Sequence, residues 1–252
     1  MLAAALAVAL VSPGASPVVV LVSANAEWKV VREALPAAVT SPSPFGEFFS
    51  HRVTAGSGSI PIVVFHGGWG KIAAAASTQY AIDRWRPRLL LNLGTCGGFR
   101  GEIAKGDVIL VDRTVVYDII EQMGDASQAI ADYSTDLDVA WAAGELPAGV
   151  RHGLLLSADR DILPSDIPRL RARYRGVAAD WESGAIAYVA HANRTPILIL
   201  RGVSDLVGEG GGEAYGNEAV FEEGTRQVMT KLIGQLPMWL SRWESWETKA
   251  RR

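Results

Sequence analysis

The 252-residue sequence contains one cysteine, Cys96, and this scarcity excludes an internal disulfide bond. A single cysteine fits a reducing compartment, so we expect a cytoplasmic protein. The four histidines are scattered without an HxxxH or CxxC spacing, and both a GxGxxG fingerprint and a Walker A loop are missing. We therefore expect no metal site and no cofactor. With a formal net charge of −3, the sequence has no basic surplus, and we expect no nucleic acid partner.

The apolar start of the chain, residues 1–11, is too short to cross a bilayer, and no Lys or Arg precedes it as in a secretory signal. We interpret residues 1–16 as an N-terminal extension, either poorly ordered or the product of an upstream start codon, with a short signal segment as the alternative. No membrane partner is expected. Residues 17–246 are expected to form one domain, because no linker or internal repeat divides them.

Short buried strands alternate with helical stretches along most of the chain. The strand-like runs are rich in Val, Ile and Leu, which is typical of strands that are buried on both faces. These runs lie at residues 17–22, 86–93, 105–111, 153–157 and 195–205. The alternation predicts a single α/β domain with a central, mostly parallel or mixed, twisted sheet flanked by helices.

Three segments outside these runs have patterns of their own. Two strand-like stretches within residues 45–64 surround a turn at 56–59 and predict a hairpin. Residues 137–144 are expected to be helical. The glycines of residues 208–212 indicate either a lid hinge or a disordered loop.

The C-terminal segment, residues 218–246, predicts one or two helices. Trp239, Trp243 and Trp246 recur within it at intervals of three to four residues. We expect this stripe to pack on the body of the protein rather than to anchor it to a membrane.

Small apolar residues at helical spacing follow two carboxylates, Asp180 and Glu182, which stand on either side of Trp181. This pattern predicts a buried helix within residues 178–190 with acids in its first turn, where the helix dipole stabilises negative charge. Acids in a first turn are often only caps, so this stretch by itself does not establish a functional site.

An apolar strand within residues 195–205 ends in Arg201, Ser204 and Asp205. In an α/β sheet, charged groups at the carboxyl end of a buried strand lie where ligands bind. A lone Asp in this position is often only a cap for the next element. The two charged stretches are close in the sequence, however, and converging buried charges favour a functional site.

Two further features lie at predicted strand ends. Glu27 follows the first strand at its junction with a helix, and local sequence alone favours a solvated first-turn acid. Glycines within residues 94–98 follow another buried strand. Together with Thr95 they allow a ligand to come within hydrogen-bond distance of backbone and hydroxyl groups.

Taken together, these stretches resemble the nucleoside phosphorylase and nucleosidase superfamily, over roughly residues 17–235. The resemblance is carried in order by residues 24–27, 70–75, 92–99 (NLGTCGGF), 105–108 (KGDV), 180–187 (DWESGAIA) and 201–205 (RGVSD). No single motif is specific, but the combination is. Within the superfamily, the sequence is most similar to 5′-methylthioadenosine/S-adenosylhomocysteine nucleosidases, and its GTCGGF run is most similar to the plant type.

The resemblance implies a nucleoside phosphorylase-like fold and cleavage of an N-ribosyl bond. Asp205 is similar to the general acid that protonates a purine at N7, with Ser204 in support. Glu182 resembles the carboxylate that holds the ribose hydroxyls. Asp205 would need a raised pKa to donate a proton near neutral pH, which a buried site can provide.

Glu27 resembles the acid that binds and activates the attacking water, which Arg201 and Thr95 help to position. Elementary chemistry agrees with these roles, because the bond breaks toward a cationic oxocarbenium sugar that nearby carboxylates stabilise. A proton donor on one side and a water-activating carboxylate on the other is also the arrangement of inverting glycosidases.

The nucleophile is expected to be water. Phosphorylases of the superfamily bind phosphate with arginines, one of which precedes the glycine loop, and this chain has Asn92 there. A phosphate dianion needs compensating charge, and only Arg201 is obviously near. Two alternatives stay open, namely a phosphorolytic purine nucleoside phosphorylase and a catalytically inactive nucleoside-binding module.

Three departures from the family pattern limit the choice of substrate. Trp181 stands where the family has a Met beneath the sugar. At the base-stacking position the family has an aromatic or large apolar residue, and this chain has Asp161 or Ile162, depending on alignment; Asp161 could read a base by hydrogen bonding but could not stack on it. Residues 123–135, where the family accepts the 5′ substituent, show no recognisable pattern. The resemblance also implies a homodimer, because these enzymes complete the 5′ pocket from a neighbouring subunit.

Overall fold

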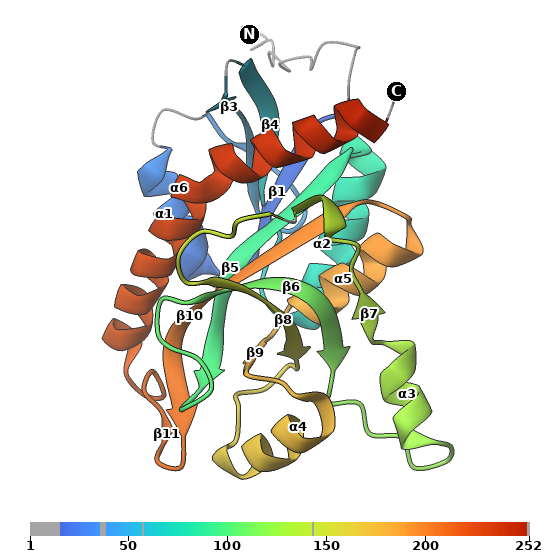
Figure 1. Cartoon of the computed structure of the whole chain (residues 1–252), viewed down its shortest axis with the longest axis vertical. Coiled ribbons are helices and arrows are strands. Elements are labelled where there is room, and N and C mark those ends of the chain that lie inside the picture. Colours follow the sequence, from blue (N-terminus) through green and yellow to red (C-terminus); the bar gives the residue numbers. More distant parts are fainter. Residues whose placement is uncertain (1–15, 36–38, 57, 143, 251–252) are drawn as a thin grey trace, which may run out of the picture.

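The computed structural model describes residues 16–35, 39–56, 58–142 and 144–250. The N-terminal extension predicted for residues 1–16 lies, apart from Ser16, outside the described residues. Strands and helices alternate along the rest of the chain, and a central sheet is covered by helices (Figure 1).

The strands of the described residues form one mixed sheet. They are β1 (Val18–Val22), β2 (Ser41–Pro42), β3 (Glu47–Ala55), β4 (Gly58–His66), β5 (Leu89–Phe99), β6 (Val108–Val116), β7 (Thr135–Asp136), β8 (Val150–Ser157), β9 (Ala178–Asp180), β10 (Ile197–Gly208) and β11 (Gly211–Gly212). The hairpin predicted within residues 45–64 is confirmed by the antiparallel pairing of β3 with β4.

The central part of the sheet is parallel, in the order β4, β1, β5 and β10. Beyond it, β10 pairs antiparallel with β6, β6 and β8 are parallel, and β9 joins β8 back to β5. The strands β5, β10, β6, β8 and β9 therefore close into a ring. The predicted mostly parallel or mixed α/β architecture is confirmed. All five residues of β1 are buried, as expected for a strand covered on both faces.

The helices are α1 (Asn25–Ala34), α2 (Gly70–Trp85), α3 (Ala126–Asp132), α4 (Ile167–Tyr174), α5 (Ser183–Ala192) and α6 (Glu218–Ala250), with short 3-10 turns η1 (Ala140–Ala142) and η2 (Pro164–Asp166). Helix α2 packs against α5, and α1 against α6. None of the helices in the described ranges is long and apolar enough to cross a membrane.

Helix α6 runs along the sheet, against β10, β5 and β3. It contains Pro237, which has no N–H for the helical hydrogen bond, and the helix changes direction along its length in Figure 1. Trp239 and Trp243 are buried and Trp246 is 40% exposed, so the prediction that this stripe packs on the body is confirmed.

Three predictions of local structure were wrong. The buried helix predicted within residues 178–190 exists as α5, but the acids do not lie in its first turn: Asp180 ends strand β9, and Glu182 is the N-cap of α5. The helix expected over residues 137–144 is only the single turn η1, while α3 forms earlier in the same region. The glycine-rich stretch 208–212 is a hairpin in which β10 turns back into β11, so the alternative of a disordered loop was wrong, whereas the lid hinge stays a prediction. In each case strand pairing or turn geometry, which leaves little periodicity in the sequence, determines the local structure.

Candidate active site

A cleft of about 960 Å³ opens where the parallel strands β1, β5 and β10 end. Such a volume accommodates a small-molecule ligand. Seven of the nine residues predicted for the site line this cleft, and they are Glu27, Thr95, Asp161, Ile162, Trp181, Glu182 and Asp205. The other two, Arg201 and Ser204, are buried behind its wall.

Glu27 lies at the first turn of α1 and is only 2% exposed, so the interpretation from local sequence as a solvated acid was wrong. Its Oε1 accepts hydrogen bonds from the backbone N of Thr95 at 2.6 Å and from Thr95 Oγ1 at 2.9 Å. Its Oε2 accepts one from the backbone N of Ala24 at 3.1 Å. Tertiary contacts with β5 therefore bury this carboxylate.

Arg201 on β10 is fully buried and forms the centre of an ionic cluster. Its Nε lies 2.8 Å from Asp180 Oδ2. Its Nη2 is 3.7 Å from Glu182 Oε2, and its Nη1 is 3.8 Å from Glu27 Oε1. One guanidinium thus faces three buried carboxylates that come from three different elements.

The guanidinium of Arg201 fits only because residue 94 is glycine. A Cβ atom on Gly94 would lie 1.4 Å from Arg201 Nη1 and 2.8 Å from Glu27 Oε1. Arg201 Nη2 donates to Asn92 Oδ1 at 2.9 Å, whereas Nη1 is buried without a hydrogen-bond partner. A buried donor without a partner is costly, and its presence at the wall of a cleft points to a ligand or solvent oxygen.

Asp180 is a site residue that was absent from the predicted set. Its carboxylate accepts hydrogen bonds from Ser157 Oγ and from the backbone N of Ser183, and it pairs with Arg201. Its position at the end of β9, between β5 and β8, brings it to the cleft. The sequence did offer a signal, because Asp180 lies two residues before Glu182. The sequence analysis placed both acids in the first turn of a helix, where acids are often only caps.

Glu182 lies between the starts of two helices. It is the N-cap of α5, and its Oε1 accepts a hydrogen bond of 3.1 Å from the backbone N of Gly70, the first residue of α2. Burial raises the pKa of Glu182 to about 8. The Arg201 guanidinium opposes this rise, and the negative charges of Asp180 and Glu27 add to it.

Asp205 is buried near the end of β10, where the pairing with β5 shifts register between Val203 and Asp205. Such a bulge re-aims side chains, and it presents Asp205 to the cleft while Ser204 stays behind the wall. Ser204 Oγ donates to Asp205 Oδ1 at 2.7 Å. Burial raises the pKa of Asp205, although the hydrogen bond from Ser204 opposes the rise.

The structure separates the two candidates for the base-stacking position. Ile162 is buried and lines the cleft, whereas Asp161 lines it as an exposed side chain. Tyr215, which sequence reasoning missed, also lines the cleft, and its hydroxyl donates to the carbonyl oxygen of Ile162 at 3.0 Å. An apolar side chain and an aromatic ring thus lie together near Asp205.

Trp181 stacks on Trp69, with ring centroids 4.6 Å apart and an interplanar angle of 25°. Trp69 is the N-cap of α2 and is 61% exposed, and both rings line the cleft. Because Trp69 precedes Gly70, the aromatic pair lies directly beside the Glu182 carboxylate.

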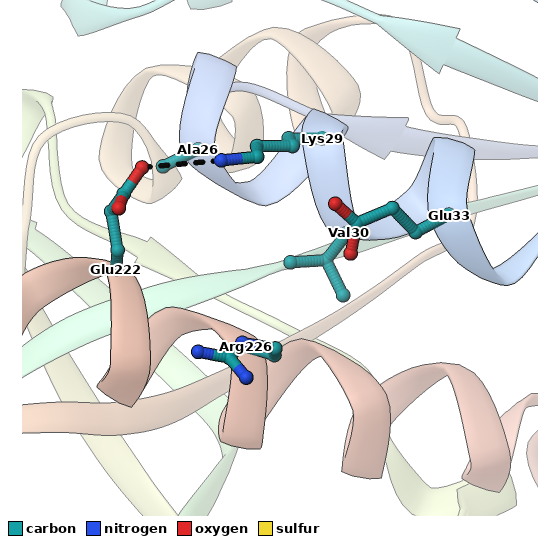
Figure 2. Close-up of a pocket in the computed structure, with 6 residues that line it drawn as sticks. All are labelled: Ala26, Lys29, Val30, Glu33, Glu222 and Arg226. Atoms are coloured by element: carbon teal, nitrogen blue, oxygen red, sulfur yellow. Dashed lines mark hydrogen bonds and ion pairs between the residues drawn. The ribbon is translucent and has the colours of Figure 1, made fainter.

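A smaller hollow of about 290 Å³ lies between α1 and α6 (Figure 2). It is lined by Ala26, Lys29, Val30, Glu33, Glu222 and Arg226. The ion pair of Lys29 with Glu222, 3.4 Å long and largely exposed, spans the two helices. Exposed pairs of this kind contribute little free energy, and none of the predicted site residues lines this hollow.

Metal ligands and a reactive thiol are not found beside these carboxylates. Within the described ranges, no group of three or more His, Cys, Asp or Glu side chains could hold a metal ion. Burial raises the pKa of the Cys96 thiol far above its usual range, so this residue is no thiolate nucleophile. The chemistry available beside Arg201 is that of carboxylates, one guanidinium and the hydroxyl of Thr95.

Residues 17–234 match the model of the phosphorylase superfamily. The chain belongs to this superfamily. A 5′-methylthioadenosine/S-adenosylhomocysteine nucleosidase of Maridesulfovibrio salexigens is 28% identical over 197 residues, which cover 73% of this chain and 84% of the relative. The nucleosidase of the same name from Geobacillus thermodenitrificans is 31% identical over 162 residues, covering 60% and 69% respectively.

Solved structures of superfamily members have the same fold. The Neisseria meningitidis 5′-methylthioadenosine/S-adenosylhomocysteine nucleosidase in complex with methylthio-immucillin-A aligns with a TM-score of 0.72 at 22% identity, covering 90% of this chain and 99% of the other. The Streptococcus pneumoniae MTA/SAH nucleosidase in complex with 8-aminoadenine aligns with a TM-score of 0.73 at 20% identity and the same coverage. The predicted nucleoside phosphorylase-like fold is confirmed.

Proposed function

We propose that this chain is a nucleosidase that hydrolyses the N-glycosidic bond of purine nucleosides of the 5′-methylthioadenosine and S-adenosylhomocysteine type. The observation that carries the proposal is the cleft itself, around which Glu27, Glu182 and Asp205 lie with a buried arginine beside the first two. The names of the relatives in the superfamily support the same reaction.

Asp205 is the proton donor to the base. Its raised pKa keeps the carboxyl group protonated to a higher pH than an exposed aspartate. As the bond between the anomeric carbon and the base nitrogen breaks, its electron pair moves into the base, and the proton of Asp205 neutralises that charge at a ring nitrogen. Ser204 stabilises the carboxylate that is left.

Glu27 is the acceptor of a proton from the attacking water. A water oxygen beside Arg201 Nη1 would accept from this unpartnered donor and donate to Glu27 Oε1, from which Nη1 is 3.8 Å away. Thr95 holds the Glu27 carboxylate by two hydrogen bonds. The water oxygen then bonds to the anomeric carbon while its proton passes to Glu27.

Glu182 holds the ribose hydroxyls and faces the developing positive charge of the sugar. Two hydroxyl donors would favour the ionised carboxylate, which burial disfavours in the free protein. Because the carboxylate interacts more strongly with the cationic sugar of the transition state than with the neutral substrate, it lowers the activation barrier.

Water is favoured over phosphate as the nucleophile by the charge around Arg201. Asn92 is occupied at both ends, because its Nδ2 donates to the Leu21 carbonyl oxygen at 3.0 Å and its Oδ1 accepts from Arg201. The single guanidinium already faces three carboxylates. A dianion at this point would meet net negative charge.

We further propose a cytoplasmic homodimer. Three large apolar side chains in the segments that carry Lys71 and Asp118 are at least 80% exposed, and they are Ile72 on α2 and Ile120 and Met123 in the segment after β6. The ion pair of Lys71 with Asp118 joins these two regions. Exposed apolar groups of this size favour burial against another protein surface. Light scattering after size-exclusion chromatography should give twice the monomer mass, and Met123→Asp should reduce it.

The function is tested by measuring base release from methylthioadenosine, adenosylhomocysteine, adenosine and inosine, with and without phosphate. Release of free base and a reducing sugar without phosphate is expected. Glu27→Gln should lower kcat about 100- to 10,000-fold, as expected for loss of a general base. A rate that requires phosphate and yields ribose 1-phosphate products would select phosphorolysis, and tight binding without release would select a binding module.

A further inference from the structure

Glu213 contacts Leu206, the residue after Asp205, and does not line the cleft. It follows strand β11, and its backbone pairs with the residue after the acid, because Glu213 N donates to Leu206 O at 3.0 Å. Its side chain returns to the same residue, since Oε2 accepts from Leu206 N at 3.3 Å. Both backbone groups of Leu206 are thus held by one residue.

The Glu213 carboxylate also binds two cations from the segment between β5 and β6. Its Oε1 lies 2.7 Å from Arg100 Nη2, and its Oε2 lies 3.1 Å from Lys105 Nζ. These hydrogen bonds and charges lower the pKa of Glu213, so it is ionised at neutral pH. One anion therefore pairs with two cations, of which Lys105 acts on the general acid Asp205.

The groups around Asp205 shift its pKa in opposite directions. Besides burial, the negative charges of Glu213 and of Asp161 on the loop after β8 raise the pKa of Asp205. The hydrogen bond from Ser204 and the positive charge of Lys105 lower it. The Tyr215 hydroxyl, whose own pKa is raised, faces the same region and carries no charge at neutral pH.

Glu213 also anchors one wall of the cleft. Residues 214–217 follow it directly and line the cleft, and the Tyr215 hydroxyl fastens this wall to the carbonyl oxygen of Ile162, which also lines the cleft. The contacts of Glu213 with Arg100, Lys105 and Leu206 fix the beginning of the same wall. A change at Glu213 thus reaches both the acid and the surface that packs on the base.

We propose that Glu213 is a positioning residue for the general acid: it pairs with Arg100 and Lys105 and ties the backbone after Asp205 to the cleft wall. This inference rests on the proposed function, because that function makes Asp205 the proton donor. Glu213 itself touches no substrate. It acts by keeping Asp205 protonated and in place over the pH range in which the enzyme works.

The test is the pH dependence of kcat/KM for methylthioadenosine in Glu213→Gln. Removing the carboxylate takes away a charge that raises the pKa of Asp205 and frees the cation that lowers it. The alkaline limb of the profile should therefore move to lower pH, by about half a unit for partly exposed charges. Above the limb the rate should fall about threefold more than it does below the limb.

Two further variants separate this role from a general loosening of the hairpin. Glu209→Gln removes the same charge from an exposed position of the same hairpin, where the side chain has no partner among the described residues, and should leave the limb in place. Lys105→Gln removes a cation that lowers the pKa of Asp205 and should move the limb to higher pH. An alkaline limb that stays fixed in Glu213→Gln would overturn the proposal. So would alkaline limbs that move in the same direction in Glu213→Gln and in Lys105→Gln.

A readout without turnover distinguishes this inference from the proposed function. The carboxyl carbon of Asp205 can be titrated by NMR in 13C-aspartate-labelled protein and assigned from its absence in Asp205→Asn. The titration midpoint should be lower in Glu213→Gln than in the natural protein. If base release fails but this shift is found, the coupling stands and only the function is wrong. If base release occurs without the shift, Glu213 serves only the fold.

Discussion

The two ends of the cleft hold their charges in different ways. At one end, Arg201 is fully buried and meets Asp180, Glu182 and Glu27, which are also buried. At the other end, Asp205 is buried, but the charges that shift its pKa include those of Lys105 and Glu213, whose side chains are 46% and 29% exposed. One end is a closed ionic cluster and the other is a single acid under the influence of solvated charges.

This difference predicts different responses to mutation. Burying a charge carries a large desolvation cost, and removing one partner of a buried pair typically costs 3–5 kcal/mol because the other charge is left uncompensated. The Arg201 cluster should therefore be needed for folding as well as for chemistry. Asp205 makes no ion pair within 4 Å among the described residues, so its role can be removed while the fold is kept.

The largest expected effect is the loss of turnover in Asp205→Asn. An amide cannot donate the proton that the leaving base needs, so kcat on methylthioadenosine should fall by about 100- to 10,000-fold. The melting temperature should stay within a few degrees, since the amide oxygen still accepts from Ser204. Steady-state kinetics and thermal melts check this, and near-normal turnover would remove Asp205 from the mechanism.

Gly94→Ala should disrupt the ion pairs of the Arg201 cluster most directly. The new Cβ would lie 1.4 Å from Arg201 Nη1, so the guanidinium must leave its three carboxylates. We expect a loss of about 3 kcal/mol or more in the free energy of unfolding, measured by urea denaturation.

The matched control for Gly94→Ala is Gly153→Ala on β8, where the nearest atom to the new Cβ is Ile109 Cγ2 at an ordinary 3.4 Å. It should cost much less. Equal losses in the two variants would mean that the space at Gly94 is not reserved for Arg201.

Because the pKa of Glu182 is raised, the Arg201 cluster should make the free energy of unfolding depend on pH. The folded state keeps the Glu182 proton up to about pH 8, whereas the unfolded chain releases it near pH 4.5. The folded state therefore binds more protons in this window, and its stability falls as pH rises through it. The contribution should be about 1–3 kcal/mol, and Glu182→Gln should flatten the dependence of the unfolding free energy between pH 5 and 8. An unchanged slope would mean that Arg201 holds Glu182 ionised.

The sequence predicted the sheet and most of the site because these depend on local signals. Buried strands appear as Val- and Leu-rich runs, and charged residues at their ends mark the cleft in an α/β fold. On this basis Glu182, Arg201 and Asp205 were expected to converge, and the structure places Glu182 and Asp205 at one cleft with Arg201 behind its wall. The resemblance to the superfamily was needed for Glu27, whose burial depends on Thr95 from a distant strand.

What the sequence could not predict depends on pairing across the sheet. The short strand β9 has only three residues, and its pairing with both β5 and β8 decides that Asp180 faces Arg201. The bulge before Asp205 and the hairpin at Gly211 are likewise set by hydrogen-bond register. Residue 94 must be glycine because the Arg201 side chain from another strand occupies the space beside it, and no local sequence pattern indicates this.

The smallest expected effect concerns Trp69. This residue shares a property with each end of the cleft, because its side chain is exposed but its ring is held by stacking on Trp181. An aromatic pair contributes about 0.5–1.5 kcal/mol, so Trp69→Ala should loosen Trp181 beside Glu182 and raise KM for methylthioadenosine about two- to tenfold. The value of kcat should change little, because the carboxylates and Arg201 keep their contacts. Trp246→Ala is the control, since Trp246 is also partly exposed and contacts another tryptophan, Trp243, on α6. If Trp69→Ala lowers kcat instead, the aromatic pair orients Glu182 in the transition state and belongs with the buried cluster.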